Sequence, residues 1–239
     1  MRNIDVCLSP ELLHLYDIEG KVVVVVDVLR ATSCMVTAIA NGVKEIIPVS
    51  KLDECVELVN QGCLGAAERD GKKAEGFEYG NSPFSYMCDE IVGETLAMTT
   101  TNGTLAINKS KIADEVIIGA FINKTAIIKY LIDQPKDVVI LCAGWKGKVN
   151  LEDTLFAGAV VEGVFDEFTC EHDGSLAALA IYENTKHDLL GFLSNCSHFR
   201  RLKKLNIQKD IEFCLKHDVY DVVPVLQGEK VVSLAKVEA

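Results

Sequence analysis

The feature that most constrains this chain is an uninterrupted run of valines, residues 22–26, which ends at Asp27. A continuous β-branched run is typical of a strand buried on both faces, as in a parallel sheet covered by helices. In open α/β sheets, ligands bind beyond the carboxyl ends of such strands. Asp27 and Arg30 follow the run and therefore stand where a site for an anion and a metal ion would lie. Alternatively, Asp27 only caps the helix that follows.

The overall composition limits the classes of partner that this chain can have. Its 239 residues are 49% hydrophobic, which is enough for one domain over residues 1–239 or for two fused subdomains, 1–120 and 121–239. A formal net charge of −11 argues against a nucleic-acid partner. The same charge would repel a small anionic substrate, so a site for one needs local positive charge or a divalent cation.

Cysteine usage and hydropathy predict a cytoplasmic protein that does not enter a membrane. The 9 cysteines are scattered and include no Cys-x-x-Cys pair, a distribution that fits free thiols in a reducing compartment. The first residues have an early acid and lack the apolar core of a signal sequence. No apolar stretch approaches the roughly 20 residues of a membrane-spanning helix.

Strand-like and helix-like segments alternate along the chain and predict an α/β fold: a three-layer α/β/α sandwich around a mixed, mostly parallel sheet. The last segments, 222–226 and 230–235, have the pattern of a hairpin, expected at an antiparallel edge that could pair with a second copy in a homodimer. The stretch 69–83 is predicted to be a long loop. Strands are expected at 4–8, 21–27, 43–49, 63–67, 95–99, 115–118 and 137–142, and helices at 32–41, 52–60, 102–108 and about 123–133.

Polar residues follow four of the predicted strands, and the carboxyl ends of parallel strands share one rim of a sheet. We therefore expect these residues to converge. Asp27 and Glu68 are suited to share a Mg²⁺ ion, which prefers carboxylate oxygens and retains several waters. The residues at the four ends are Asp27 and Arg30; Glu68; Thr100, Thr101, Asn102, Gly103 and Thr104; and Ala143, Gly144, Lys146 and Lys148.

Three further groups each have two interpretations. The stretch 100–104 has the hydroxyls and glycine of a phosphate cradle at a helix start, but Thr101 or Asn102 could simply be its cap. The pair Glu152 and Asp153 could be catalytic, or could only offset a helix dipole. His198 could protonate a leaving group, or could be a surface or capping residue.

Three common phosphate-handling motifs are missing from the sequence. A haloacid-dehalogenase-type site needs a second aspartate where Leu29 stands, and a tyrosine-phosphatase loop from Cys142 needs arginine where Lys148 stands. No Gly-Lys-Ser/Thr sequence of a phosphate-loop ATPase occurs.

The motifs nevertheless resemble those of the 2-phosphosulfolactate phosphatase family, in the family's order and over most of the chain. The sequence differs from the family pattern in the loop 69–71 after Glu68 and at Asn150, where serine is expected. The matching blocks are Asp27-Val28-Leu29-Arg30-Ala31-Thr32, Ala40-Asn41-Gly42, Gly80-Asn81-Ser82-Pro83, Thr100-Thr101-Asn102-Gly103-Thr104, Cys142-Ala143-Gly144, Leu151-Glu152-Asp153, Ser197-His198, Asp210-Ile211, Cys214-Leu215 and Val223-Pro224.

The resemblance implies a Mg²⁺-dependent phosphomonoesterase that releases sulfolactate and phosphate, a step of coenzyme M biosynthesis. Two alternatives remain: a phosphatase for another small phosphorylated hydroxy acid, and a non-catalytic anion-binding protein on the same scaffold. The substrate would carry phosphate, carboxylate and sulfonate, so an acidic protein must concentrate cations around it. Beside Mg²⁺ and Arg30, we expect Lys146 or Arg200 to contribute.

The resulting hypothesis assigns a role to each candidate residue. Asp27 attacks phosphorus itself or only helps to hold the metal. Asp153 is a second metal ligand or a base, and His198 protonates the leaving oxygen. The metal ligands are Asp27, Glu68 and Glu152; the phosphate clamp is Arg30; and the other substrate contacts are Thr32, Asn81, Ser82, Thr101, Asn102, Gly103, Thr104, Gly144 and Lys146.

Overall fold

The valine run forms the central strand of the parallel part of the sheet. A computed structural model describes residues 1–234, in which β2 (Val22–Val26) pairs in parallel with β7 (Glu115–Gly119) and β8 (Val138–Cys142). All five valines are fully buried. Alternate side chains of β2 enter two different hydrophobic cores, so the strand is covered on both faces as the sequence predicts.

The described strands form an 11-stranded sheet with the order β5-β4-β6-β3-β11-β10-β7-β2-β8-β1-β9. Most pairings are parallel, and the antiparallel ones are β4 with β5 and those made by the hairpin β10–β11. The predicted mixed, mostly parallel sheet is therefore confirmed. The remaining strands are β1 (Arg2–Cys7), β3 (Glu45–Pro48), β4 (Leu64–Arg69), β5 (Lys72–Lys73), β6 (Thr95–Thr99), β9 (Phe168–Thr169), β10 (Pro224–Gln227) and β11 (Lys230–Ser233).

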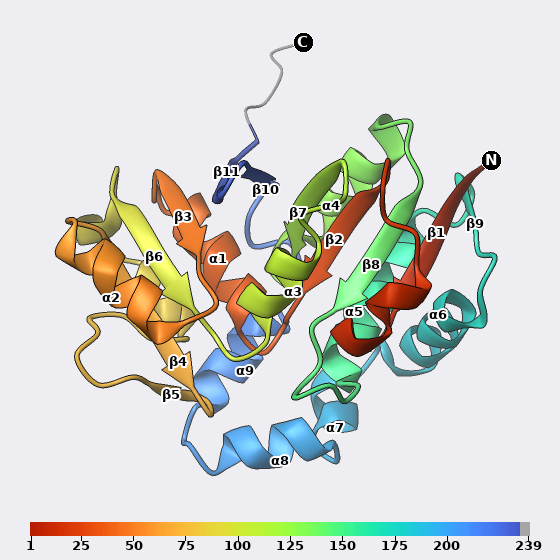
Figure 1. Ribbon diagram of the computed structural model, residues 1–239. Coiled ribbons are helices and arrows are strands. Elements are labelled where there is room, and N and C mark those ends of the chain that lie inside the picture. The colour runs from red at the N-terminus through yellow and green to blue at the C-terminus, as the bar shows by residue number, and fades with distance from the viewer. Residues whose placement is uncertain (235–239) are drawn as a thin grey trace.

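Helices cover both faces of this sheet, which confirms the three-layer architecture (Figure 1). Val24 packs in the core that contains α5, whereas Val23 and Val25 pack in the core that contains residues of η1 and α3. The α-helices are α1 (Ala31–Ala40), α2 (Leu52–Asn60), α3 (Gly103–Lys109), α4 (Lys124–Asp133), α5 (Leu151–Gly163), α6 (Asp173–Thr185), α7 (Leu189–Leu193), α8 (Ser197–Lys203) and α9 (Gln208–Cys214), and the 3-10 helices are η1 (Pro10–Leu15), η2 (Pro83–Tyr86), η3 (Asp89–Ile91) and η4 (Phe121–Asn123).

The C-terminal hairpin forms as predicted, but its expected position at an edge is wrong. Strand β10 pairs with β7 and β11 pairs with β3, so the hairpin lies inside the sheet and joins two sets of parallel strands. Val225 and Val231 are buried there, which explains the apolar sequence. Over its described residues, the hairpin therefore has no free edge for a second copy, and a homodimer stays a prediction without this support. Residue 235, the predicted end of the hairpin, lies outside the described residues.

The predicted loop 69–83 is not entirely loop, and Glu68 lies within a strand rather than after it. Strand β4 continues to Arg69, and β5 folds back against it with Glu68 opposite Lys73. Gly71 closes the turn with a φ of +84°, a conformation that suits glycine. Glu68 is thereby fixed at the end of the sheet, at the wall of the site described below.

Two further expectations concern domains and membranes. The sheet combines strands from both 1–120 and 121–239, and the division of the chain into domains stays a prediction. Within the described residues, no helix is both long enough and apolar enough to cross a membrane.

Candidate active site

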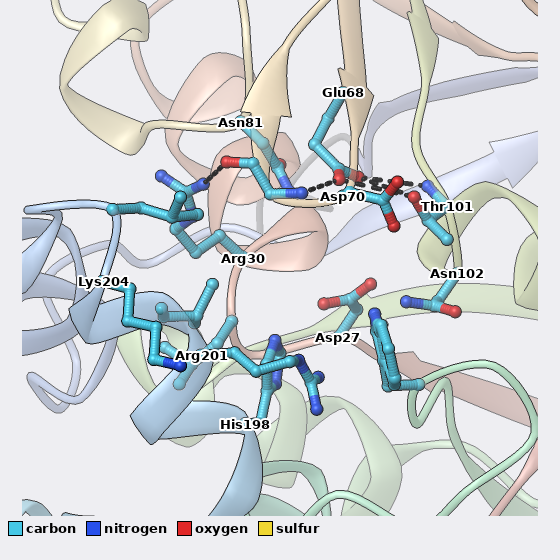
Figure 2. Close-up of a pocket in the computed structure, with 15 residues that line it drawn as sticks. Asp27, Arg30, Glu68, Asp70, Asn81, Thr101, Asn102, His198, Arg201 and Lys204 are labelled. Carbon is cyan, nitrogen blue, oxygen red and sulfur yellow. Dashed lines mark hydrogen bonds between the residues drawn. The ribbon is translucent and has the colours of Figure 1, made fainter.

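A cavity of about 280 Å³ lies at the carboxyl ends of the parallel strands, near the lower end of the range for small-molecule sites. It joins residues that are far apart in sequence, from β2, β4, β6, β8 and α8 (Figure 2). The structure thus brings together the strand ends that the sequence predicted to converge. The cavity is lined by Asp27, Leu29, Arg30, Glu68, Asp70, Gly71, Asn81, Thr101, Asn102, Trp145, His198, Arg201, Leu202, Lys204 and Leu205.

Asp27 is a buried carboxylate that faces the cavity, and it also contributes to the start of α1. Its side chain is only 7% exposed. Its Oδ1 accepts a long hydrogen bond of 3.4 Å from the backbone N–H of Ala31, and its own N–H donates to Thr32 Oγ1 at 3.0 Å. Asp27 therefore has part of the capping role, while Thr32 holds the backbone of Asp27 rather than lining the cavity. No cationic side chain of the described residues forms an ion pair with Asp27.

Burial raises the pKa of Asp27 to about 7. The nearby His198 opposes this shift, and the negative charge of Glu68 adds to it. A raised pKa means that burial disfavours the charged form of this carboxyl group, and a cation bound nearby would favour it. Such a perturbed carboxyl group in a cavity is characteristic of functional sites.

Glu68 lines the same cavity and is held firmly in place. Its carboxylate accepts hydrogen bonds from the Gly71 N–H, from the Thr101 N–H at 3.1 Å and from the Thr101 hydroxyl at 3.2 Å. The backbone and side-chain donors of Thr101 are therefore already used by Glu68. Thr101 lines the cavity as predicted, but in this arrangement it orients a carboxylate.

The start of α3 approaches Asp27 closely because residue 103 is glycine. A Cβ at Gly103 would lie 2.6 Å from the Cβ of Ala31 and 3.1 Å from Asp27 Oδ2. Thr104 is fully buried, donates from its N–H to Thr100 Oγ1 at 3.2 Å, and donates from its hydroxyl to the Thr100 carbonyl at 3.0 Å. Gly103 and Thr104 therefore shape the turn, whereas Asn102 lines the cavity.

Arg30 lines the cavity, but its charge is already matched. It forms a buried ion pair with Asp210, and its Nη2 donates to the Gly71 carbonyl at 2.9 Å. Asp210 also accepts a hydrogen bond of 3.1 Å from Ser82 Oγ, so Ser82 supports this ion pair. A guanidinium group has five N–H donors, and those left over are available to a ligand. Because the pair is buried, Arg30 supplies geometry here more than net positive charge.

His198 is buried in the cavity wall, so it is not a surface residue. Its Nδ1 contacts Glu152 Oε1 and lies 3.1 Å from Asn150 Nδ2. Glu152 is almost completely buried and is not among the cavity-lining residues. A carboxylate that holds one ring nitrogen of a histidine fixes the orientation of the ring and leaves the other nitrogen for chemistry. Here the nitrogen left over is Nε2.

Asp153 and Gly144, both predicted to be site residues, lie just behind the cavity. Asp153 accepts hydrogen bonds from the N–H of Val28 at 2.9 Å and from that of Gly144 at 3.0 Å, and so ties the ends of β2 and β8 together. Burial raises the pKa of Asp153 well above its ordinary value, and the charges of Glu152 and Asp27 add to this effect. Neither residue is among those that line the cavity.

The positive charge of the site comes mainly from a helix face that the sequence analysis did not identify. Lys146 pairs with Asp70 at 2.9 Å at the rim, and Arg200 is exposed and does not line the cavity. Instead, Arg201 and Lys204 line it. The i, i+3 spacing from His198 was the available signal, because residues three apart share one face of a helix.

Asp27 and Glu68 fit a magnesium ion better than a metal held only by protein ligands. Across residues 1–234, no three His, Cys, Asp or Glu side chains gather into a group that could hold a metal ion. Mg²⁺, however, is usually bound through one or two carboxylates and completes its shell with water and phosphate oxygens. Two buried carboxylates at one cavity match this mode of coordination. Glu152 instead faces His198, and its assignment as a metal ligand stays a prediction.

The raised pKa of Asp27 predicts a pH-dependent effect of Asp27→Asn on stability in metal-free buffer. The unfolded chain releases this proton near pH 4 and the folded protein near pH 7, so the wild type loses stability relative to the variant as the pH rises between these values. We expect the difference in melting temperature, variant minus wild type, to increase from pH 5 to pH 7 and then level off. A difference that is constant across this range would contradict the assignment.

Comparison with known proteins places the chain in a family. Residues 7–229 match the family model described as 2-phosphosulpholactate phosphatase. Three relatives bear the name "Probable 2-phosphosulfolactate phosphatase". The protein of Caldanaerobacter subterraneus subsp. tengcongensis is 42% identical over 89% of this chain and 90% of its own length. That of Thermotoga maritima is 38% identical over 93% and 95%, and that of Clostridium botulinum 35% over 97% and 100%. The chain therefore belongs to the 2-phosphosulpholactate phosphatase family.

Proposed function

We propose that this protein is a Mg²⁺-dependent phosphomonoesterase that hydrolyses 2-phosphosulfolactate to sulfolactate and phosphate, in the pathway of coenzyme M biosynthesis. The observation that carries the proposal is the cavity, in which buried carboxylates face cations that form no ion pair among the described residues. Glu68 lies on one side of the cavity and Arg201 and Lys204 on the other, with Asp27 between them (Figure 2). The identity of the proposed substrate is taken from the names of the relatives.

Asp27 and Glu68 would hold the metal ion at the end of the sheet. When bound, Mg²⁺ neutralises phosphoryl oxygens, the main electrostatic requirement of phosphoryl transfer. The remaining N–H donors of Arg30 would contact the phosphate from the adjacent wall. Arg30 is kept in place by Asp210 and by the Gly71 carbonyl, so its position does not depend on the substrate.

His198 would protonate the leaving oxygen. In the reaction, a bond forms to phosphorus from water or from Asp27, the bond from phosphorus to the C2 oxygen breaks, and that oxygen takes a proton from His198 Nε2. If Asp27 attacks, a water molecule then displaces it from phosphorus and releases phosphate. In either route the attacking water returns a proton to His198. Glu152 holds Nδ1 and so keeps Nε2 directed to the cavity. The stereochemical course at phosphorus distinguishes the routes: direct attack by water inverts the configuration of an isotopically chiral phosphate group, and two successive displacements through a phospho-aspartyl intermediate retain it.

The cysteines support a cytoplasmic location for this reaction. All nine lie within the described residues and are unpaired. Five of them are buried, including Cys34 and Cys142 beside the valine strand. Free buried thiols persist in a reducing compartment.

The metal requirement is tested by chelation and by the variant Asp27→Asn. With 2-phosphosulfolactate as substrate, we expect EDTA to abolish phosphate release by the wild type and added Mg²⁺ to restore it. Asp27→Asn should lose at least about 100-fold in kcat at every Mg²⁺ concentration, because a metal ligand or nucleophile is gone. The exposed Asp166→Asn serves as the matched control. Turnover of Asp27→Asn within a few fold of wild type would contradict the assigned role.

The role of His198 is tested with two leaving groups. For 2-phosphosulfolactate, whose alkoxide needs a proton, we expect His198→Asn to lower kcat by roughly 10²–10⁴-fold. For p-nitrophenyl phosphate, whose phenolate leaves without protonation, the loss should be much smaller. Equal losses on both substrates would show that His198 acts in binding or folding rather than as the acid.

A further inference from the structure

Unlike Arg30 and Lys146, Arg201 has no anionic partner among residues 1–234. Arg30 is paired with Asp210, and Lys146 with Asp70. Arg201 forms no ion pair within the described part of the chain, and its buried Nη2 has no hydrogen-bond partner there. A buried donor without a partner is costly, which indicates that a ligand completes this site.

Trp145 fixes the plane of the Arg201 guanidinium. The guanidinium carbon lies 3.6 Å from the centroid of the indole ring. Trp145 is itself held by a tight turn in which it exchanges backbone hydrogen bonds with Lys148, at 2.8 and 3.0 Å. Stacking occupies a face of the guanidinium and leaves its N–H edges free to bind an anion in the same plane.

Two more groups on the cavity wall lack partners. Asn81 Oδ1 is buried and has no hydrogen-bond partner among residues 1–234, and the two ends of an amide side chain can exchange places to present its N–H donors. Lys204 is exposed at the cavity and forms no ion pair within residues 1–234. Arg201 and Lys204 lie on the side of the cavity away from Glu68 and Thr101, with Asp27 between (Figure 2).

We propose that Arg201, stacked on Trp145, binds the sulfonate of the substrate and so makes the enzyme prefer sulfonated phosphate esters. This inference rests on the proposed function, which places the phosphate beside Asp27 and Glu68. Since phosphate and sulfonate are on adjacent carbons, the sulfonate must then lie a short distance away, within the same small cavity. A sulfonate is a weak base and a poor magnesium ligand, whereas the weakly hydrated guanidinium suits it.

The test compares two substrates that differ only in the sulfonate. 2-Phospholactate keeps the phosphate and the carboxylate of 2-phosphosulfolactate but ends in a methyl group. For Arg201→Gln we expect kcat/KM for 2-phosphosulfolactate to fall roughly 100-fold, since a charge-assisted bidentate contact is lost. Activity on 2-phospholactate should remain within about threefold of wild type, which also shows that the variant is folded.

The neighbouring residue provides the matched control. Arg200→Gln removes the same charge from an exposed position of α8 and should leave both activities unchanged. Arg201→Lys keeps the positive charge but loses the planar pair of N–H donors of the guanidinium. It should therefore retain only part of the preference for 2-phosphosulfolactate over 2-phospholactate. Equal losses of Arg201→Gln on both substrates would show that Arg201 binds the shared carboxylate or phosphate. Unchanged kinetics of Arg201→Gln would remove it from substrate binding. Either result overturns the proposal.

A binding measurement separates this inference from the proposed function. Calorimetric titration with sulfolactate should give at least about tenfold weaker affinity for Arg201→Gln than for the wild type and for Arg200→Gln. Titration with inorganic phosphate should give equal affinities for all three. If sulfolactate binding depends on Arg201 while the wild type releases no phosphate, the proposed function fails and the sulfonate site stands. If the wild type releases phosphate but sulfolactate binds the wild type and Arg201→Gln with equal affinity, the sulfonate site fails and the proposed function stands.

Discussion

The burial of two carboxylates, Asp27 and Glu68, at one cavity is the constraint on which the rest of the site depends. A chain of net charge −11 places both carboxylates at one small cavity and gives Asp27 no ion-pair partner among the described residues. Glu68 is held by Thr101 and the Gly71 N–H, so it cannot turn away without losing these hydrogen bonds. Gly103 lets the turn before α3 come close to Asp27. The fold thus maintains an electrostatic cost that a bound cation would relieve.

The cations around this pair are held in different ways, which suggests different roles. Arg30 is buried and neutralised by Asp210, so it is a rigid part of the wall. Arg201 is stacked on Trp145 and keeps unpaired donors for a ligand. His198 is oriented by Glu152 behind it. A substrate with several negative groups would therefore meet a separate partner for each: a metal ion for phosphate, a guanidinium for sulfonate and a proton donor for the leaving oxygen.

The sequence predicted well what depends on local pattern. The run of valines predicted the central strand, and the ends of the predicted strands predicted where Asp27, Glu68 and Asn102 meet. The sequence did not predict features that depend on contacts between residues far apart in the chain. The hairpin β10–β11 has the local pattern of an edge, but it pairs with β3 and β7 only in the folded sheet. Similarly, nothing near Arg30 in the sequence shows that Asp210 neutralises it.

Other predictions differ from the structure because a side chain can donate to more than one partner, or because a helix can turn different faces to the cavity. Thr101 has the chemistry of a phosphate contact, yet its donors are used by Glu68. Arg200 and Arg201 are equivalent by composition, and only the orientation of α8 decides which of them enters the cavity. Helical spacing from His198 selects Arg201, so part of this information was present in the sequence.

The central claim, that Asp27 and Glu68 hold a divalent cation, is tested most directly by crystals soaked with Mn²⁺ and sulfolactate. The account predicts an anomalous-scattering peak at the two carboxylates, which should be lost in crystals of Asp27→Asn. A fully occupied peak elsewhere in the molecule, or one that persists unchanged in Asp27→Asn, would contradict it.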